Sequence, residues 1–316
     1  MKKLTWVLAH EPYNIFLKAA THFANRIAEE SNGQFQIDVK SLAQYNEQTG
    51  AELTAHAADR TKVIELVNNG TIDMATVYVN SLGKIHNDLY ALGMPFLFND
   101  HVHSEKVLDG KIGSHLLRGI ETKSNVKGLA FTYSGGFRII PSQRAIERLE
   151  DFYDLQIRCG LSPVAVDTFE SVGAKPQQIL IDDFAEAFDS NTVQAGETTY
   201  PRFFALGHDK SSKVINHTEH SLFLTSIVTN TKVWNELDSN MRSLFADAAL
   251  EAAKIERQES LADIDKVQLE AARQGIETVK MTTKERERFA RATSGLYTKY
   301  DSIFESGLLK EIKKAV

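Results

Sequence analysis

The feature that most constrains the fold is the alternation of short apolar runs with amphipathic helical stripes in the first half of the chain. Residues 4–9 form a short apolar run, and residues 35–39 alternate apolar with polar side chains, as strands do. Between them, apolar residues recur at helical spacing over residues 16–28, and Asn32-Gly33 supplies a stop. A helix around residues 63–67 and a strand at 72–79 continue the order. Repeated strand–helix–strand order predicts a largely parallel sheet with helices on its faces.

The last third of the chain is strongly helical. Residues 232–274 contain neither Pro nor Gly and are rich in good helix formers, which predicts one spanning helix or two abutting ones. Gly275 ends this stretch, and Thr282-x-x-Glu285 is a capping box for a final helix. The 316 residues suffice for one large domain or two of about 150 residues. Because no Pro/Ser-rich linker is present, we expect two lobes joined by several crossing strands.

The middle of the chain adds further strands and turns. We expect a strand at residues 128–133 that Gly135-Gly136 breaks, and another at 155–159 that carries Arg158. Adjacent helical residues point apart, so Asp182-Asp183 is better explained as a helix cap than as an acid pair.

Composition excludes several classes of function. The formal net charge is −6, so the chain has no overall field for nucleic acid or an anionic membrane, and an anionic ligand requires a few local cations. No apolar run approaches the ~20 residues of a membrane helix. The lone Cys159 excludes an internal disulfide and is expected to be inert packing. The start Met1-Lys2-Lys3 precedes too short an apolar stretch for a signal peptide, so we expect a mature domain whose export signal was removed.

Catalytic, metal and cofactor motifs do not appear. His10-Glu11 lacks the second His of a zinc protease helix, and the His101/His103 and His217/His220 pairs are better explained as solvated or core histidines. Gly135-Gly136 matches neither a dinucleotide nor a phosphate-loop pattern, and no nucleophile elbow is present. The sequence therefore predicts no metal, no cofactor and no catalysis.

Two arginines are the candidate binding residues. Arg158 ends a predicted strand, where ligands of open α/β sheets bind, and Arg138 follows the turn that Gly135-Gly136 permits. A guanidinium there can hold a carboxylate through two parallel hydrogen bonds. Each is equally well explained as a surface arginine on these grounds alone.

An ordered set of short motifs runs over essentially the whole chain. The motifs are Ala9-His10-Glu11, Phe23-Ala24, Ser31-Asn32-Gly33, Asn69 to Met74, Met94 to Phe98, Gly135 to Arg138, Leu155 to Arg158, Val172 to Pro176 and Val233 to Leu237. Each motif is weak, but their order is specific. In this order they resemble the solute-binding proteins of TRAP (tripartite ATP-independent periplasmic) transporters, of the C4-dicarboxylate-binding type.

The resemblance implies an α/β periplasmic-binding-protein fold of two lobes, with mixed sheets, hinge strands and a long helix spanning both lobes. We assign 1–130 plus 216–255 to lobe I and 131–215 plus 256–316 to lobe II. It also implies a periplasmic protein that encloses a small carboxylate between its lobes by hinge closure and delivers it to TRAP membrane permease subunits. We expect a monomer. Arg158 matches the carboxylate clamp of the family, and Arg138 matches an assisting arginine twenty residues earlier.

Two departures from the family pattern bear on the ligand. Thr198 stands where the family usually has Asn, and the stretch Gln44–Gly50 with residues 56–62 is longer and more polar than the usual loop. Both favour a polyhydroxy carboxylate such as a sugar acid over a simple dicarboxylate, with Gln44, Tyr45, Asn46 and Gln48 as candidate hydroxyl partners if that loop reaches the ligand.

Further candidate ligand contacts are Glu11, Tyr78, Asn80 and Tyr200. Glu11 could accept hydrogen bonds from ligand donors, and the two tyrosines could stack. Two rival functions stay open: an enzyme that uses the same site, and a sensor that presents its ligand to a receptor kinase.

Overall fold

The computed structural model describes residues 1–53 and 57–315, with all their side chains except those of 57–60 and 182. By the density of its internal contacts, the chain divides into two compact units. Unit 1 consists of Met1–His86, Glu105–Ser134 and Leu224–Ser260, and unit 2 of Asn87–Ser104, Gly135–Phe223 and Leu261–Val316. The chain passes from one unit to the other repeatedly. The predicted lobes consist of two segments each, whereas each unit here consists of three. The predicted lobe boundaries stay a proposal.

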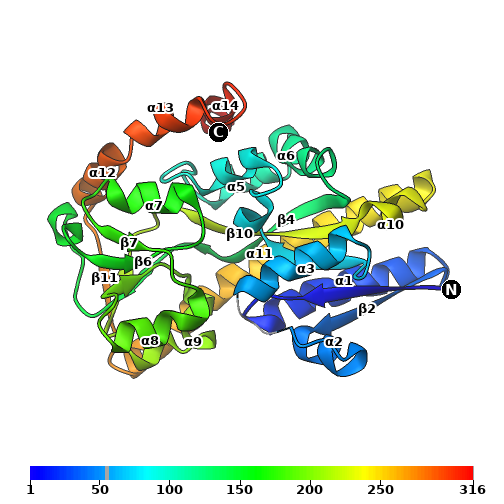
Figure 1. Cartoon of the computed structure of the whole chain (residues 1–316), viewed down its shortest axis with the longest axis horizontal. Helices are drawn as coiled ribbons and strands as arrows, with labels where there is room; N and C mark the ends of the chain where they lie inside the picture. The colour runs from blue at the N-terminus through cyan, green and yellow to red at the C-terminus, as the bar shows by residue number, and fades with distance from the viewer. Residues whose placement is uncertain (54–56, 316) are drawn as a thin grey trace. The chain divides into compact units, whose positions relative to one another are not determined.

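Unit 1 is built on a five-stranded sheet of described residues in the order β2-β1-β3-β10-β4 (Figure 1). The central strand pairs are parallel, β1 with β2 and with β3, whereas β10 runs antiparallel to β3. The sheet is therefore mixed, as the resemblance implies. Its strands are β1 (Lys2–Leu8), β2 (Phe35–Ser41), β3 (Met74–Tyr78), β4 (Val126–Phe137) and β10 (Leu222–Asn230).

The core of unit 1 forms where helical apolar stripes meet this sheet. The Phe23 ring meets Trp6 edge-on at 5.1 Å between centroids, and meets Phe245 at 5.6 Å. Burying an aromatic side chain of this kind contributes roughly 1.5–3 kcal/mol. The helices that begin in unit 1 are α1 (Tyr13–Glu30), α2 (Leu42–Thr49), α3 (Ala57–Asn68), α4 (Val79–Leu82), α6 (Lys111–Glu121), α10 (Thr231–Asn235) and α11 (Ser239–Arg273), the last of which continues into unit 2.

Unit 2 holds a six-stranded mixed sheet of short strands in the order β11-β9-β5-β8-β6-β7. β6 pairs in parallel with both β7 and β8, while β5 pairs antiparallel with β8 and β9. The strands are β5 (Ile140–Ser142), β6 (Gln156–Arg158), β7 (Lys175–Gln177), β8 (Ala195–Gly196), β9 (Val214–His217) and β11 (Glu277–Lys280).

The other helices of unit 2 are short, and Phe152, Phe169 and Phe289 lie together in one of its core clusters. The α-helices are α5 (His101–Leu108), which crosses from unit 2 into unit 1, α7 (Pro163–Glu170), α8 (Phe184–Asp189), α9 (Tyr200–Ala205), α12 (Thr283–Ala292), α13 (Gly295–Asp301) and α14 (Leu308–Lys314). The 3₁₀ helices are η1 (Asn87–Gly93), η2 (Leu149–Phe152), η3 (Ile181–Asp183) and η4 (His208–Lys210).

The predicted strand break at Gly135-Gly136 is wrong, because β4 continues through both glycines to Phe137. The two residues adopt φ angles of +93° and +76°, which glycine reaches without a steric penalty. A side chain at Gly135 would place its Cβ 2.5 Å from Thr199 Oγ1. The glycines therefore reshape the strand end and let it approach α9, rather than ending the strand.

The predicted helical run 232–274 is two helices, α10 and α11. The break falls at Asp238, whose carboxylate accepts a hydrogen bond from Met241 N at 2.9 Å. Helix α12 has half of the predicted capping box: Thr282 Oγ1 accepts from Glu285 N, but the Glu285 carboxylate accepts from Leu149 N at 3.1 Å. An aspartate cap on α8 is not formed by Asp183, whose side chain makes no capping bond, and the Asp182 side chain lies outside the described residues.

The predicted polar loop at Gln44–Gly50 is helix α2, which Gly50 ends at a φ angle of +71°. Gln44 completes the capping box of this helix with Ser41, and the Asn46 side chain bonds both backbone groups of Leu53. These side chains therefore serve the local structure of unit 1. His56 lies outside the described residues.

Candidate functional site

Three segments of unit 2 bring the predicted arginines into one neighbourhood. Strand β6 ends at Arg158, which stands beside Gly196 of β8 in the parallel register. The chain then continues through Glu197 to Thr198, whose backbone bridges to Ile139, the residue after Arg138. The site is therefore built from the ends of β4, β6 and β8.

Arg158 is buried and held by two backbone carbonyl groups. Its Nε donates to Ile179 O at 2.8 Å, and its NH1 donates to Glu197 O at 3.3 Å. Carbonyl dipoles fix the plane of a guanidinium but do not neutralise its charge. This arrangement orients a positive charge at the strand end, as a carboxylate clamp requires.

Glu197 contacts several residues of this site at once. Its carboxylate is 2% exposed, with Oε2 lying 3.5 Å from Arg138 Nε and 3.4 Å from His220 Nε2. Its Oε1 accepts a hydrogen bond from Gly160 N at 2.7 Å. Burial alone would raise the pKa of Glu197, but Arg138, His220 and the Gly160 amide hold it at about 2. Glu197 is therefore an anion at neutral pH that orients Arg138.

His220 completes this buried network as a neutral ring. Burial lowers its pKa, against the opposing effect of Glu197. Thr218 Oγ1 lies 2.8 Å from Nδ1, so the network is satisfied when the hydroxyl donates to Nδ1 and Nε2 donates to Glu197. Sequence reasoning treated this histidine as one of a solvated or core pair and did not select Glu197. The only feature of the sequence that could have drawn attention to Glu197 is that it directly precedes Thr198, a predicted ligand contact.

Thr198 and Tyr200 lie in the same part of unit 2. Thr198 is 1% exposed, and its backbone N and O both bond to Ile139. Tyr200 opens helix α9, lies in a core cluster with Phe203 and Ile215, and places its hydroxyl 2.9 Å from His217 Nδ1. Burial raises the pKa of the Tyr200 phenol to about 12, so it is neutral. A ligand role for either residue stays a prediction.

The remaining candidates, Glu11, Tyr78 and Asn80, belong to unit 1. Strands β1 and β3 are parallel neighbours; Glu11 comes soon after the end of β1 and Tyr78 is the last residue of β3, so both belong to the same edge of the sheet. Glu11 Oε2 accepts a hydrogen bond from Tyr13 N at 3.0 Å, and Asn80 Nδ2 donates to Tyr78 Oη at 2.7 Å. The His10 ring lies 6.3 Å from that of Tyr78. The structure thus groups Tyr78 with Asn80, and it groups Arg138 and Arg158 separately in unit 2.

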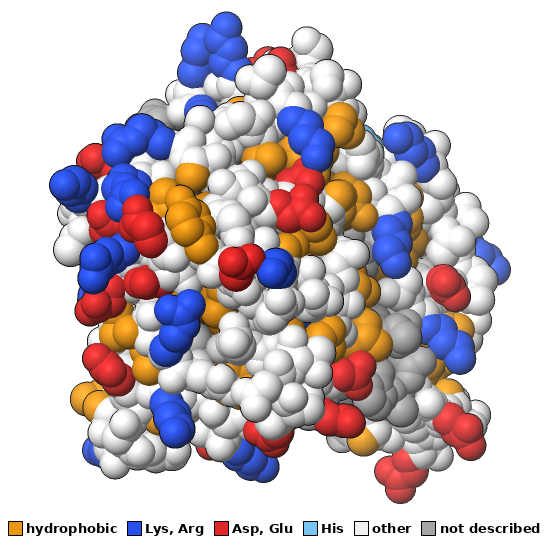
Figure 2. All heavy atoms as spheres, turned by 60° about the vertical axis from the view of Figure 1, so that its left-hand side comes forward, with side chains coloured by type: hydrophobic (Ala, Val, Ile, Leu, Met, Phe, Trp, Pro, Cys, Tyr) orange, Lys and Arg blue, Asp and Glu red, His pale blue; other side chains and the backbone are white. Residues whose placement is uncertain are grey.

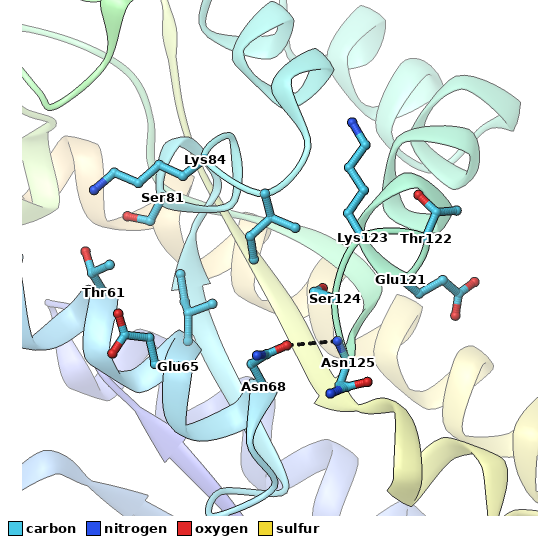
Figure 3. Close-up of a pocket in the computed structure, with 12 residues that line it drawn as sticks. Thr61, Glu65, Asn68, Ser81, Lys84, Glu121, Thr122, Lys123, Ser124 and Asn125 are labelled. Carbon is cyan, nitrogen blue, oxygen red and sulfur yellow. Dashed lines mark hydrogen bonds between the residues drawn. The ribbon is translucent and has the colours of Figure 1, made fainter.

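Unit 1 also carries an open groove of about 630 Å³ between α3, the segment after α4 and the end of α6. Figure 3 shows its polar lining, in which the Asn68 side chain accepts a hydrogen bond from Asn125 N at 2.8 Å. Lys84 and Lys123 are offset there by Glu65 and Glu121. The groove therefore offers no concentrated positive charge, and the predicted site residues do not line it.

Three further observations on the described residues concern other kinds of site. No group of three His, Cys, Asp or Glu side chains there is placed to hold a metal ion. Cys159 is buried, and burial raises the pKa of its thiol to about 12, which disfavours the reactive thiolate. No described helix is both long and apolar enough to cross a membrane. On the face in Figure 2, acidic and basic side chains are interspersed.

Known proteins are similar to this chain in sequence and in fold. The family model of bacterial extracellular solute-binding protein, family 7 (DctP) matches residues 8–303. The C4-dicarboxylate-binding protein DctB of Bacillus subtilis is 24% identical over 93% of this chain and 81% of its own length. The 2,3-diketo-L-gulonate-binding periplasmic protein YiaO of Escherichia coli is 27% identical over 73% of this chain and 69% of its own.

Solved structures of solute-binding proteins superpose along the whole chain. A TRAP periplasmic solute-binding protein from Bradyrhizobium, in complex with α/β-D-galacturonate, matches with a TM-score of 0.86 and 26% identity, covering 99% of this chain and 100% of that one. One from Pseudomonas putida F1, with bound D-glucuronate, matches with a TM-score of 0.85 and 23% identity over 98% and 96% of the two chains.

The class defined by this fold is that of the two-unit α/β solute-binding proteins. The chain belongs to the DctP family, family 7 of the bacterial extracellular solute-binding proteins. The resemblance to TRAP solute-binding proteins that the ordered motifs indicated is thereby confirmed, as is the predicted fold class.

Proposed function

We propose that this protein binds a small organic acid in the periplasm, a sugar acid or a dicarboxylate, and delivers it unchanged to the membrane permease of a TRAP transporter. The observation that most supports this proposal is the orientation of Arg158 at the end of β6, next to the Glu197–Arg138 pair. A guanidinium fixed in this way binds a carboxylate without needing to rearrange. The ligands bound by the relatives, galacturonate, glucuronate, diketogulonate and C4-dicarboxylates, are all acids.

Binding without chemistry is the favoured mode of action. The buried Glu197 carboxylate is ionised and contacts a neutral His220, whose other ring nitrogen contacts Thr218, which is a charge-orienting network rather than a nucleophile with its base. The rival functions, an enzyme and a receptor-presenting sensor, would use the same arginines. We favour a monomer with no nucleic-acid partner, because the chain carries a net charge of −6.

Replacing the clamp residue tests this proposal. We expect Arg158→Ala to weaken binding of the tightest acid by roughly 30- to 5,000-fold, since removing one partner of a buried charge pair costs about 2–5 kcal/mol. Arg158→Lys should also bind poorly, because an ammonium cannot form the bidentate contact. Isothermal titration calorimetry against hexuronates, aldonates and dicarboxylates measures this.

The exposed Arg273→Gln serves as a matched control, and circular dichroism confirms folding. Wild-type affinity in Arg158→Ala would refute the clamp. Mass spectrometry of the acid recovered after incubation with substoichiometric protein separates binding from turnover, and a converted product would favour the enzyme.

A further inference from the structure

The connection between β9 and β10, residues 218–221, holds the backbone of Arg138 from both sides. It lies wholly in unit 2. Glu219 N donates a hydrogen bond to Arg138 O at 3.1 Å, and Ser221 O accepts one from Arg138 N at 2.9 Å. Between these two residues stands His220, whose Nε2 lies 3.4 Å from the carboxylate that pairs with Arg138. The connection therefore contacts both partners of that buried ion pair.

Glu219 gives this connection an uncommon backbone conformation. Its φ angle is +49°, in the left-handed region that residues with long side chains seldom adopt. Phe96, with a φ angle of +54°, is also left-handed, and its N donates to His220 O at 2.8 Å. Backbone of this kind persists only where surrounding contacts hold it, and it is commonest at binding and catalytic sites.

Three parts of unit 2 hold Glu219 in this conformation. Its N bonds to Arg138 at the end of β4, and its carbonyl oxygen accepts from Arg286 NH2 of α12 at 3.3 Å. Its carboxylate Oε1 lies 3.0 Å from His217 Nε2 of β9. Chiefly the hydrogen bond from His217 holds the pKa of Glu219 below its ordinary value, so the carboxylate is ionised at neutral pH. The carboxylate is thus the only side-chain anchor of the left-handed residue that these contacts include.

His217 is itself oriented from the core of unit 2. The hydroxyl of Tyr200 lies 2.9 Å from His217 Nδ1, and the Tyr200 side chain belongs to a buried core cluster. These contacts are satisfied when the phenol donates to Nδ1 and Nε2 donates to the Glu219 carboxylate. The chain of bonds Tyr200–His217–Glu219 therefore connects the core to the connection that brackets Arg138.

We propose that Glu219 is a positioning residue for acid binding, whose bond to His217 keeps the connection in the conformation that places Arg138 beside Glu197. This inference rests on the proposed function, in which Arg138 assists in binding the carboxylate. Glu219 acts without touching the acid. When its carboxylate is removed, the backbone is released toward the negative φ angles that other residues prefer, and Arg138 moves with it because both its N and its O are bonded there.

Isothermal titration calorimetry with D-galacturonate, D-gluconate and succinate tests the role of Glu219. For the acid that binds the wild type tightest, we expect Glu219→Ala to bind about 10-fold more weakly, an effect in the usual range for residues in contact. Glu219→Gln should stay within about 3-fold of the wild type, because its amide oxygen still accepts from His217. Asp154→Ala is the matched control: Asp154 is also a left-handed acidic residue with an ion pair, to Lys175, and its loss should leave affinity unchanged.

A double-mutant cycle separates positioning from a general loss of structure. In an Arg138→Gln background, Glu219→Ala should weaken binding by less than about 2-fold further, because its effect passes through Arg138. A role in stability alone would weaken binding by the same factor in both backgrounds. If Arg138→Gln does not fold, Arg138→Lys provides the background. If Glu219→Ala does not fold, His217→Phe removes the same hydrogen bond and should show the same loss.

The remaining outcomes separate this inference from the proposed function. Wild-type affinity in Glu219→Ala, or an equal loss in both backgrounds, would overturn the role of Glu219 while leaving acid binding intact. Glu219→Gln binding as weakly as Glu219→Ala would assign the effect to charge rather than to the bond with His217, and would also overturn it. If none of the three acids binds the wild type, the proposed function and this inference fall together.

Discussion

At the scale of single residues, the hydroxyl of Thr198 is the group whose purpose the fold leaves open. It lies in the interior of unit 2, and Oγ1 has no hydrogen-bond partner among the described residues. The backbone of Thr198 is already secured by its two bonds to Ile139. A buried hydroxyl without a partner carries a desolvation cost, which a ligand hydroxyl or carboxylate would offset.

We therefore expect Thr198→Val to weaken binding of a polyhydroxy acid by roughly 3- to 10-fold, the usual range for one neutral hydrogen bond. Thr198→Ser should retain wild-type affinity because it keeps the hydroxyl. Thr198→Val should not lower the melting temperature appreciably, since Val matches Thr in shape, whereas Thr198→Ser loses one buried methyl group and should melt slightly lower. Competition calorimetry with succinate and a hexuronate measures both the effect and the ligand preference. If succinate binds tighter than every sugar acid, the inference from Thr198 fails.

The site residues that the sequence predicted stand in recognisable local patterns, whereas the residue that it missed does not. Arg158 follows an apolar strand and Arg138 follows two glycines, so each stands at a position that local patterning marks. Glu197 lies in a short polar run, and nothing in its surroundings distinguishes a buried carboxylate from a solvated one. Its burial is decided by Arg138 and His220, which come from distant segments. Long-range ion pairs of this kind have no local sequence signature.

At the scale of elements, the same limit appears in the boundaries of strands and helices. Apolar periodicity correctly predicted α1 and β2, because burial there follows the helical or strand period. The long helix was predicted instead from its good helix formers and its lack of Pro and Gly. It failed at Gln44–Gly50, where α2 is held by a capping box and a glycine cap rather than by a broad apolar face. It also failed at Gly135-Gly136, where a strand ladder continues through glycines that usually punctuate turns.

One buried carboxyl joins two of the long elements within unit 1. The Glu256 side chain of α11 is fully buried; it accepts a hydrogen bond from Tyr133 N of β4 at 2.6 Å, and its other oxygen lies 2.6 Å from Ser260 Oγ. Tyr133 and Ser260 lie at or next to the last unit 1 residues before the chain enters unit 2 along β4 and α11. Burial raises the pKa of Glu256 to about 8, against the smaller opposing effects of Ser260, Tyr133 and Arg257.

This raised pKa makes the stability of the protein depend on pH in a definite direction. The folded protein holds a proton on Glu256 that the unfolded chain releases near pH 4.5, so folding stability falls as the pH rises from about 4.5 to about 8. We expect Glu256→Gln, which mimics the protonated acid, to melt several degrees higher than the wild type at pH 9. This corresponds to about 2 kcal/mol. Thermal unfolding at pH 5 and pH 9 checks this, and an equal difference at both values would contradict it.

At the scale of the whole molecule, the path of the chain determines which motions the backbone permits. The chain leaves one unit for the other after His86, Ser104, Ser134, Phe223 and Ser260, and four of these crossings lie inside α5, β4, β10 and α11. Two further properties follow from this path. Neither unit is a continuous segment, so neither can be expressed alone as a simple truncation. Any relative motion must also be absorbed by regular elements rather than by a flexible linker, which limits it to bending at a few residues.

We therefore predict that ligand binding shifts the protein toward a more compact arrangement by bending at these crossings. A ligand that prefers the compact state draws the population toward it in proportion to that preference. Small-angle X-ray scattering should show a smaller radius of gyration when the tightest-binding acid of the panel saturates the wild type. Arg158→Ala at the same acid concentration should retain the ligand-free profile, because its binding is lost while its crossings are intact. An unchanged wild-type profile at saturation, together with a ligand-free profile that is not already compact, would show that the units do not move on binding.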